Sequence, residues 1–194
     1  MNYPLQLRFK ILALAPQIFV RDARGATICY VKQKLFRFRE KVEVFADDSR
    51  HSLLGTIQAD RILDFSANYA FQMQDGSRLG SVRRRGLRSI WRAHYEILDD
   101  TGAVAFVVRE ENPVAKLVDS MLGQIPIVGL FTGLVCHPRY LVSRNGIPVA
   151  QFTKGRALLE SYFTMEKLGD LDAREELRIV LSLIMFVLLE RSRG

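Results

Sequence analysis

The densest group of side chains that could do chemistry is a run of arginines between positions 78 and 92. It contains no acidic residue and consists of Arg78, Arg83, Arg84, Arg85, Arg88 and Arg92. A guanidinium can donate two parallel hydrogen bonds to a phosphate, so several arginines on one rim would suit a phosphate or head-group site. Strict strand alternation would place Arg83 and Arg85 on one side and Arg84 on the other, unless the strand bulges or ends there. The competing interpretation is a solvated strand end, so we expect the cluster as a whole, rather than any single arginine, to contact anions.

A second basic group precedes the first in the chain. It consists of Lys32, Lys34, Arg37, Arg39 and Lys41. On a strand, Lys32 and Lys34 share the outward face, where lysines also serve to prevent edge pairing. A binding role requires them to lie next to Arg83, which equivalent positions in the repeat described below make possible. The predicted anion-binding site is therefore Arg83, Arg84, Arg85, Arg88, Arg92, Lys32 and Lys34.

Catalytic and metal-binding motifs are missing from the sequence. The histidines are His51, His94 and His137, without HxxxH or HExxH spacing. Cys136 and His137 are chain neighbours, whereas a nucleophile and its base normally come from separate elements. No GxSxG, GxxxxGK or GxGxxG motif occurs. We expect no enzymatic activity, no metal and no cofactor.

Composition narrows the class of protein. Lys and Arg number 28 against 21 Asp and Glu, a formal net charge of +7, which favours anionic partners. Apolar residues at 48% and charged residues at 25% exclude a disordered chain and a polytopic membrane protein. Cys29 and Cys136 are far apart, as expected for reduced thiols, and the apolar run Ile11–Ala15 is too short for a signal peptide. The expected location is the cytoplasm, with peripheral membrane association left open.

Turn-like clusters recur along the chain and define a repeat. They are Asp22–Gly25, Asp75–Gly76, Asp99–Gly102 and Asn145–Gly146, and a unit of about 26 residues adds a turn at Asp47–Arg50, without glycine. The position five residues before each anchor (25, 51, 76, 102, 146) is apolar: Val20, Ala46, Phe71, Ile97 and Leu141. The position six after is also apolar: Val31, Ile57, Val82, Val108 and Phe152. Each unit is predicted to be a β-hairpin with one buried face.

Two further strands and an insertion complete the β region. Leu5–Leu12 and Ser161–Met165 are strand candidates, which raises the total to about a dozen strands. The last interval of the repeat is too long, and the extra residues, about 113–136, are predicted to form a short helix and an apolar loop that caps the barrel. Gly129 and Gly133 form a GxxxG pattern there, so shallow insertion into a membrane interface stays open.

The C-terminal segment, about 172–191, is predicted to be a helix that is buried on all sides. Its stretch Ile179–Leu189 contains one polar residue, Ser182. Eleven residues span only roughly 16 Å, about half of a bilayer's hydrocarbon thickness. The interior of the protein is therefore the better environment. A sheet of hairpins that curls around this helix removes its own exposed edges, so we predict a mainly β, closed antiparallel barrel of about twelve strands in a single domain, 1–194.

The first hairpins resemble those of the LURP-one-related family. The resemblance rests on Ile28–Phe36, on Glu40, on Val42–Phe45 and on Asp47. The hairpin repeat, the segment Pro126–Pro138 before Tyr140-Leu141-Val142, and the apolar terminal helix extend it over nearly the whole chain. This family is grouped with tubby-like and phospholipid scramblase-like barrels. The resemblance implies twelve strands around a central hydrophobic helix, and an association with phosphoinositide binding or lipid movement.

The expected function is therefore non-enzymatic binding of an anionic ligand, with phospholipid or phosphoinositide head groups at a membrane surface as the first choice. The alternative is nucleic-acid binding by the same arginines, with Trp91, Tyr95 and Tyr69 as stacking groups, although these aromatics fall mainly on predicted core positions. A third possibility, a ligand-carrying barrel or an enzyme with a scattered site, requires an interior not filled by Leu181, Ile184, Met185 and Leu188.

Overall fold

The computed structural model of the chain describes residues 1–10, 17–32, 41–60, 67–84, 94–111, 139–156 and 160–191. These residues form twelve strands and one helix. The strands are β1 (Leu5–Lys10), β2 (Gln17–Arg21), β3 (Thr27–Lys32), β4 (Val42–Phe45), β5 (Leu53–Ala59), β6 (Asn68–Met73), β7 (Arg78–Arg84), β8 (His94–Leu98), β9 (Val104–Glu111), β10 (Arg139–Arg144), β11 (Ile147–Arg156) and β12 (Glu160–Lys167). The helix is α2 (Ala173–Arg191).

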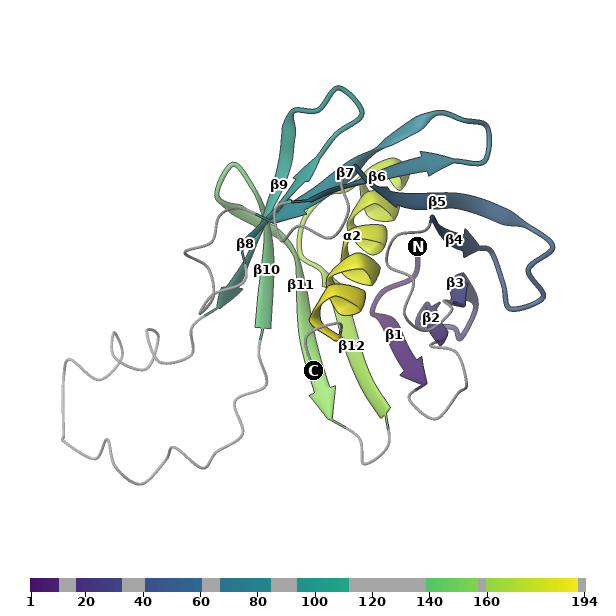
Figure 1. Ribbon diagram of the computed structural model, residues 1–194. Coiled ribbons are helices and arrows are strands. Elements are labelled where there is room, and N and C mark those ends of the chain that lie inside the picture. Colours follow the sequence, from purple (N-terminus) through teal and green to yellow (C-terminus); the bar gives the residue numbers. More distant parts are fainter. Residues whose placement is uncertain are drawn as a thin grey trace.

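The strands form one closed antiparallel barrel (Figure 1). Each strand pairs with its neighbours in sequence, and β1 pairs with β12 from Leu5↔Met165 to Lys10↔Glu160. This last pairing gives partners to backbone groups that an open sheet would expose at its two edges. The predicted fold, a closed barrel of about twelve strands around a helix, is confirmed.

The hairpin turns occur where the glycine spacing predicts them. Gly25, Gly76, Gly102 and Gly146 have φ between +82° and +91°, values that favour glycine. Arg50 has φ +60° at the turn that lacks a glycine. The repeat is therefore preserved there by a non-glycine residue in the left-handed region.

Aspartates at the start of four turns perform one local task. Each carboxylate accepts a hydrogen bond of 2.9–3.0 Å from the backbone N–H two residues later. The pairs are Asp22 with Arg24, Asp47 with Ser49, Asp75 with Ser77 and Asp99 with Thr101. The pKa of all four carboxyl groups is lowered, first by hydrogen bonds from the side chains of Asn2, Ser49, Ser77 and Thr101 and then by the backbone hydrogen bonds. Their charge is thus part of the turn structure.

Helix α2 occupies the interior of the barrel (Figure 1). Every residue from Ile179 to Leu188 is at most 5% exposed, so the prediction of a helix buried on all sides is confirmed. Leu181, Ile184, Met185 and Leu188 are each at most 3% exposed. These four side chains are therefore packed inside the described part of the barrel, at the place where the third possibility expects open space.

Aromatic side chains from three strands surround one residue of the helix. The ring of Phe186 lies 5.3 Å from that of Tyr95, 4.8 Å from that of Tyr140 and 6.0 Å from that of Phe163, all in edge-on geometry. Such aromatic pairs contribute about 0.5–1.5 kcal/mol each beyond their buried area. They fix the C-terminal half of α2 against β8, β10 and β12.

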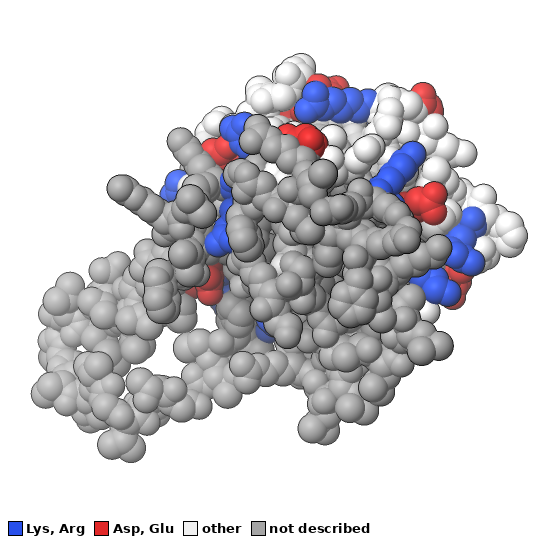
Figure 2. Space-filling model, viewed as in Figure 1, with Lys and Arg blue, Asp and Glu red and all other residues white. Residues whose placement is uncertain are grey.

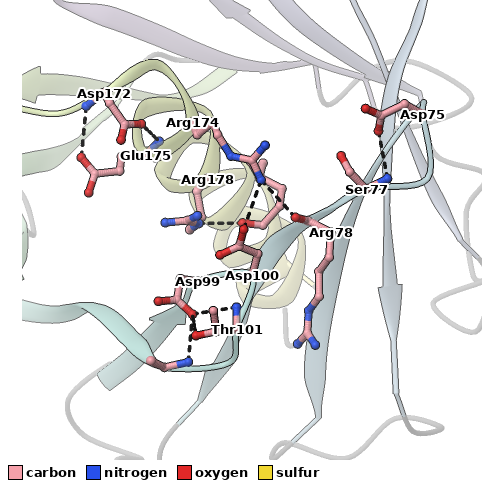
Figure 3. A network of polar contacts seen from close by, with 12 residues as sticks. Asp75, Ser77, Arg78, Asp99, Asp100, Thr101, Asp172, Arg174, Glu175 and Arg178 are labelled. Carbon is pink, nitrogen blue, oxygen red and sulfur yellow. Dashed lines mark hydrogen bonds and ion pairs between the residues drawn. The ribbon is translucent and has the colours of Figure 1, made fainter.

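The N-terminal half of α2 is held by polar contacts (Figure 3). Asp172 and Glu175 form a reciprocal capping box, with 2.8 Å and 3.1 Å bonds between each carboxylate and the other residue's N–H. Glu175 also pairs with Arg144 at 2.6 Å. Arg174 contacts the carbonyl of Arg78 at 3.2 Å and the carboxylate of Asp100 at 3.5 Å. These contacts join the helix start to three strands or turns of the barrel.

A buried arginine on α2 makes a further polar contact with the barrel wall. Arg178 is 6% exposed, and its Nε donates to the carbonyl of Leu79 at 2.8 Å. The next residue, Gly80, has φ +149°, and a Cβ there would lie 2.3 Å from the carbonyl oxygen of Leu98 and 2.8 Å from Nε of Arg178. Only glycine therefore lets β7 pass this close to both β8 and the helix.

Glu176 is a buried acid on the other side of the helix start. Its carboxylate accepts bonds of 3.0 Å from the α-amino group of Met1 and from Nζ of Lys167. Burial alone would raise the pKa of Glu176, but the bonds and charges of Lys167 and the amino group outweigh burial and lower it. The charged form of Glu176 thus ties α2 to β12 and to the N-terminal segment.

The two ends of the barrel differ in their connections. The turn end carries the connections 22–26, 46–52, 74–77, 99–103, 145–146 and 168–172, the last of which leads into α2. The loop end carries the connections 11–16, 33–41, 60–67, 85–93, 112–138 and 157–159. Successive strands run in opposite directions, so the six connections of each set all join strands at the same end of the barrel.

Two sequence predictions concern segments at the loop end. The predicted inserted helix and loop, about 113–136, and with it the GxxxG pattern, lie outside the described residues. Among the residues that the structure describes, no helix is both long and apolar enough to span a bilayer.

Candidate anion-binding site

The predicted site residues belong to connections and strand termini at the loop end. Lys32 is the last residue of β3, and Arg83 and Arg84 are the last two of β7. Arg85, Arg88 and Arg92 belong to the connection between Arg84 and His94, and Lys34 to the one between β3 and β4. These last four lie outside the described residues, as does Trp91.

Arg83 is held in an ion pair across two strands. Arg83 and Glu96 face each other in the register of β7 and β8. Nε and Nη2 of Arg83 donate to the same oxygen, Oε2 of Glu96, at 2.9 Å and 2.8 Å. The side chain of Glu96 is 5% exposed and that of Arg83 is 47% exposed. A buried carboxylate thus fixes one edge of a guanidinium that reaches solvent.

Arg84 takes the other side of β7. Its partner in register is Tyr95, whose ring packs on Phe186 inside the barrel. Val82, which shares its face of the strand with Arg84, is also buried, and Arg84 itself is only partly exposed. Arg83 and Arg84 therefore do not share one surface, as strand alternation predicts.

Lys32 is exposed but is not a neighbour of Arg83. β4, β5 and β6 lie between β3 and β7. Four strand spacings of about 4.8 Å place the two strands roughly 19 Å apart along the wall. Residues at equivalent positions of the hairpin repeat lie at the same end of the barrel. A shared end does not bring two side chains into contact when three strands separate them. The combined cluster of Lys32 with Arg83 is therefore a wider rim rather than one compact site.

Sequence reasoning missed two arginines on the same wall. Arg109 on β9 stands opposite His94 on β8, and Arg139 on β10 stands opposite Glu111 on β9. Both arginines are exposed, and within the described residues neither forms an ion pair. They are 30 residues apart in the chain, so only the strand register could have indicated that they lie on the adjacent strands β9 and β10 near the loop end.

The described charges on one face of the molecule are mixed in sign. Figure 2 shows Lys and Arg side chains next to Asp and Glu side chains around the part of that face that is described. On this face the described residues by themselves form no uninterrupted basic patch.

The tyrosines proposed for base stacking are core residues. Tyr95 is 4% exposed and Tyr69 is 8% exposed. A base cannot stack on a ring whose faces are already covered by the barrel interior. Of the three suggested stacking groups, only Trp91 stays open for a nucleic-acid role.

The described residues give little support to catalysis. No cluster of three or more His, Cys, Asp or Glu that could hold a metal ion occurs among them. Cys29 is fully buried, and burial raises the pKa of its thiol to about 12, so this thiol does not act as a nucleophile at neutral pH. Cys136 and His137 lie outside the described residues.

Comparison with models of known protein families gives no match, and no curated protein matches the sequence. The likeness to the LURP-one-related family therefore stays a prediction that rests on the residues quoted for it.

Proposed function

We propose that the chain is a non-enzymatic barrel domain that binds phospholipid head groups, phosphoinositides included, through its loop end at a membrane surface. The basic residues are Arg83, Arg85, Arg88 and Arg92, with Arg84, Lys32 and Lys34 on the same rim and with Arg109 and Arg139 on the adjoining wall. The proposal draws on the residues of the loop end and not on an interior cavity, because α2 fills the interior.

The observation that carries the proposal is the charge difference between the two ends. The six connections at the loop end contain nine Lys and Arg residues and four Asp and Glu residues. The six connections at the turn end contain two Lys and Arg residues and eight Asp and Glu residues. An anionic membrane attracts each Lys or Arg near its surface by about 1 kcal/mol, so it favours one end of this barrel and repels the other.

Vesicle co-sedimentation tests the proposal. The chain is mixed with vesicles of phosphatidylcholine alone or with phosphatidylserine added, at several salt concentrations. We expect binding to the anionic vesicles only, weakening as salt rises, because the attraction is between exposed charges. The variant R85E/R88E/R92E should weaken binding at least about a hundredfold, since it changes six charges at the membrane-facing end.

A matched triple variant at the turn end is the control. Arg24, Arg50 and Arg78 are exposed there, and R24E/R50E/R78E makes the same change in net charge. Equal loss of binding in both variants would show that net charge alone matters and would remove the loop-end proposal. Absence of binding by the unmodified chain would remove lipid recognition altogether. A steep salt dependence of binding to single-stranded DNA or RNA, without vesicle binding, would favour the nucleic-acid alternative.

A further inference from the structure

We propose that Glu96 is a positioning residue, which orients Arg83 so that its outer guanidinium edge meets the anionic head group. This inference rests on the proposed function and adds a role to a residue of opposite charge within the same site. It treats the ion pair between Arg83 and Glu96 as part of the binding surface.

The geometry of the pair separates the two edges of the guanidinium. Glu96 takes the edge formed by Nε and Nη2, with both bonds on a single oxygen. The other edge, formed by Nη1 and the second N–H of Nη2, makes no polar contact with a described residue. That edge has the fork geometry that suits two oxygens of a phosphate.

Burial makes the orientation fixed. Glu96 is 5% exposed and sits on the wall between β7 and β9, so its carboxylate is anchored. Arg83 reaches solvent with 47% of its side chain exposed, so its free edge is accessible. A flexible arginine loses rotamer freedom when it binds an anion, whereas an arginine already held by a buried carboxylate loses less.

The simpler reading of the same contact predicts the opposite result. If Glu96 only cancels the charge of Arg83, removing the carboxylate adds one positive charge to the loop end. Binding to anionic vesicles should then become tighter. If Glu96 positions Arg83, removing the carboxylate releases the guanidinium and binding becomes weaker despite the more favourable charge.

Three variants decide between these readings: E96Q, R83Q and R83Q/E96Q. Affinity is measured for vesicles of phosphatidylcholine with phosphatidylserine, and thermal unfolding without vesicles shows that each variant is folded. The double variant has the same net charge as the unmodified chain. E43Q is the control for a removed acid, because Glu43 is an exposed strand residue on the far side of β5 and β6 from Arg83.

We expect E96Q to weaken binding about threefold to tenfold, and R83Q to weaken it about tenfold, values typical of one charge-assisted hydrogen-bonded contact. The double variant should bind as weakly as R83Q, because Glu96 acts through Arg83. E43Q should bind as tightly as the unmodified chain or more tightly. R83K, which keeps the charge but not the fork, should resemble R83Q.

Each contrary outcome identifies what fails. Tighter binding by E96Q, or binding by the double variant equal to that of the unmodified chain, would overturn the positioning role and leave lipid binding intact. Failure of the unmodified chain to bind these vesicles would overturn both proposals. Loss of folded structure in E96Q would leave R83K and R83Q to decide, because equal binding by R83K and the unmodified chain contradicts the need for an oriented fork.

Discussion

The turn end and the loop end of this barrel carry opposite charge, and the structure explains only one of them. At the turn end, Asp22, Asp47, Asp75 and Asp99 each bind backbone N–H groups of their own turn. At the loop end, Arg109 and Arg139 are exposed and form no ion pair with the described residues. Charge at the turn end therefore follows from folding, whereas Arg109 and Arg139 have no such role among the described residues, and the proposed anion binding would use them.

The largest effect is expected where α2 meets the wall at the turn end. Replacing Gly80 by Ala would place a Cβ 2.3 Å from the carbonyl oxygen of Leu98 and 2.8 Å from Nε of Arg178. We expect a loss of about 3 kcal/mol or more in the free energy of unfolding, measured by urea denaturation. Gly76→Ala is the control, because φ is also positive there (+83° against +149° at Gly80) but its Cβ would meet open space. It should cost about 1–2 kcal/mol. Equal losses would show that Gly80 matters only through its backbone angle.

The second prediction concerns the stability of the turn end at low pH, which depends on Glu176. The pKa of Glu176 is lowered in the folded chain, so its contribution to stability is present above the unfolded pKa and is lost as pH falls through the folded one. Denaturation midpoints should fall as pH is lowered from about 5 to 3. Glu176→Gln should reduce stability at pH 7 by about 1–3 kcal/mol and flatten this acid dependence. An unchanged slope in the variant would show that other carboxyl groups control it.

The third prediction separates structural acids from incidental ones at the same end. Asp99 accepts bonds from the N–H groups of Thr101 and Ala103, at 3.0 Å and 2.9 Å. Asp99→Ala should therefore lower the free energy of unfolding measurably in urea denaturation. Asp48→Ala, in the turn between β4 and β5, removes an exposed acid whose carboxylate makes no hydrogen bond with a described residue, and it should change stability by less than about 0.5 kcal/mol. A similar loss in both would contradict the structural reading of the turn-end acids.

The smallest effect on stability is expected at the loop end. Arg109→Gln and Arg139→Gln should each change the free energy of unfolding by less than about 0.5 kcal/mol. Each should nevertheless weaken binding to anionic vesicles about fivefold, because each removes one cation near the membrane. Arg24→Gln, in the exposed connection 22–26 at the turn end, is the control and should leave binding unchanged. Stability losses without loss of binding would reverse the proposed contrast between the two ends.

The fold could be predicted because each hairpin of the repeat is determined by turn and apolar residues that lie close together in sequence. The five apolar positions after the turns, from Val31 to Phe152, are all buried, each at most 4% exposed. Leu141 was expected to be buried and is only half-buried. The two-residue turn Asn145–Gly146 and the register shift at Val142/Ser143 place Tyr140 and Val142 inside instead. Local spacing thus predicts the hairpins, but not every register.

The candidate site was less predictable because it depends on neighbours across the barrel. Arg83 and Glu96 are partners through the register of β7 and β8, and a cluster search along the chain counts only the arginine. Lys32 and Arg83 have equivalent positions in the repeat, yet three strands separate them. Arg109 and Arg139 are isolated in sequence and become members of one wall only when β9 and β10 pair. Which side chains become neighbours around a barrel depends on the order and register of all its strands, and spacing along the chain does not indicate it.

The most direct test of the central claim uses the chain's single tryptophan, Trp91, which lies between Arg88 and Arg92 in the loop-end connection. Its fluorescence is measured with phosphatidylcholine and phosphatidylserine vesicles that contain brominated lipids, while co-sedimentation records the bound fraction. Docking by the loop end predicts strong quenching that follows the bound fraction. Bound protein whose Trp91 is not quenched would contradict the account, because the chain would then meet the membrane by another surface.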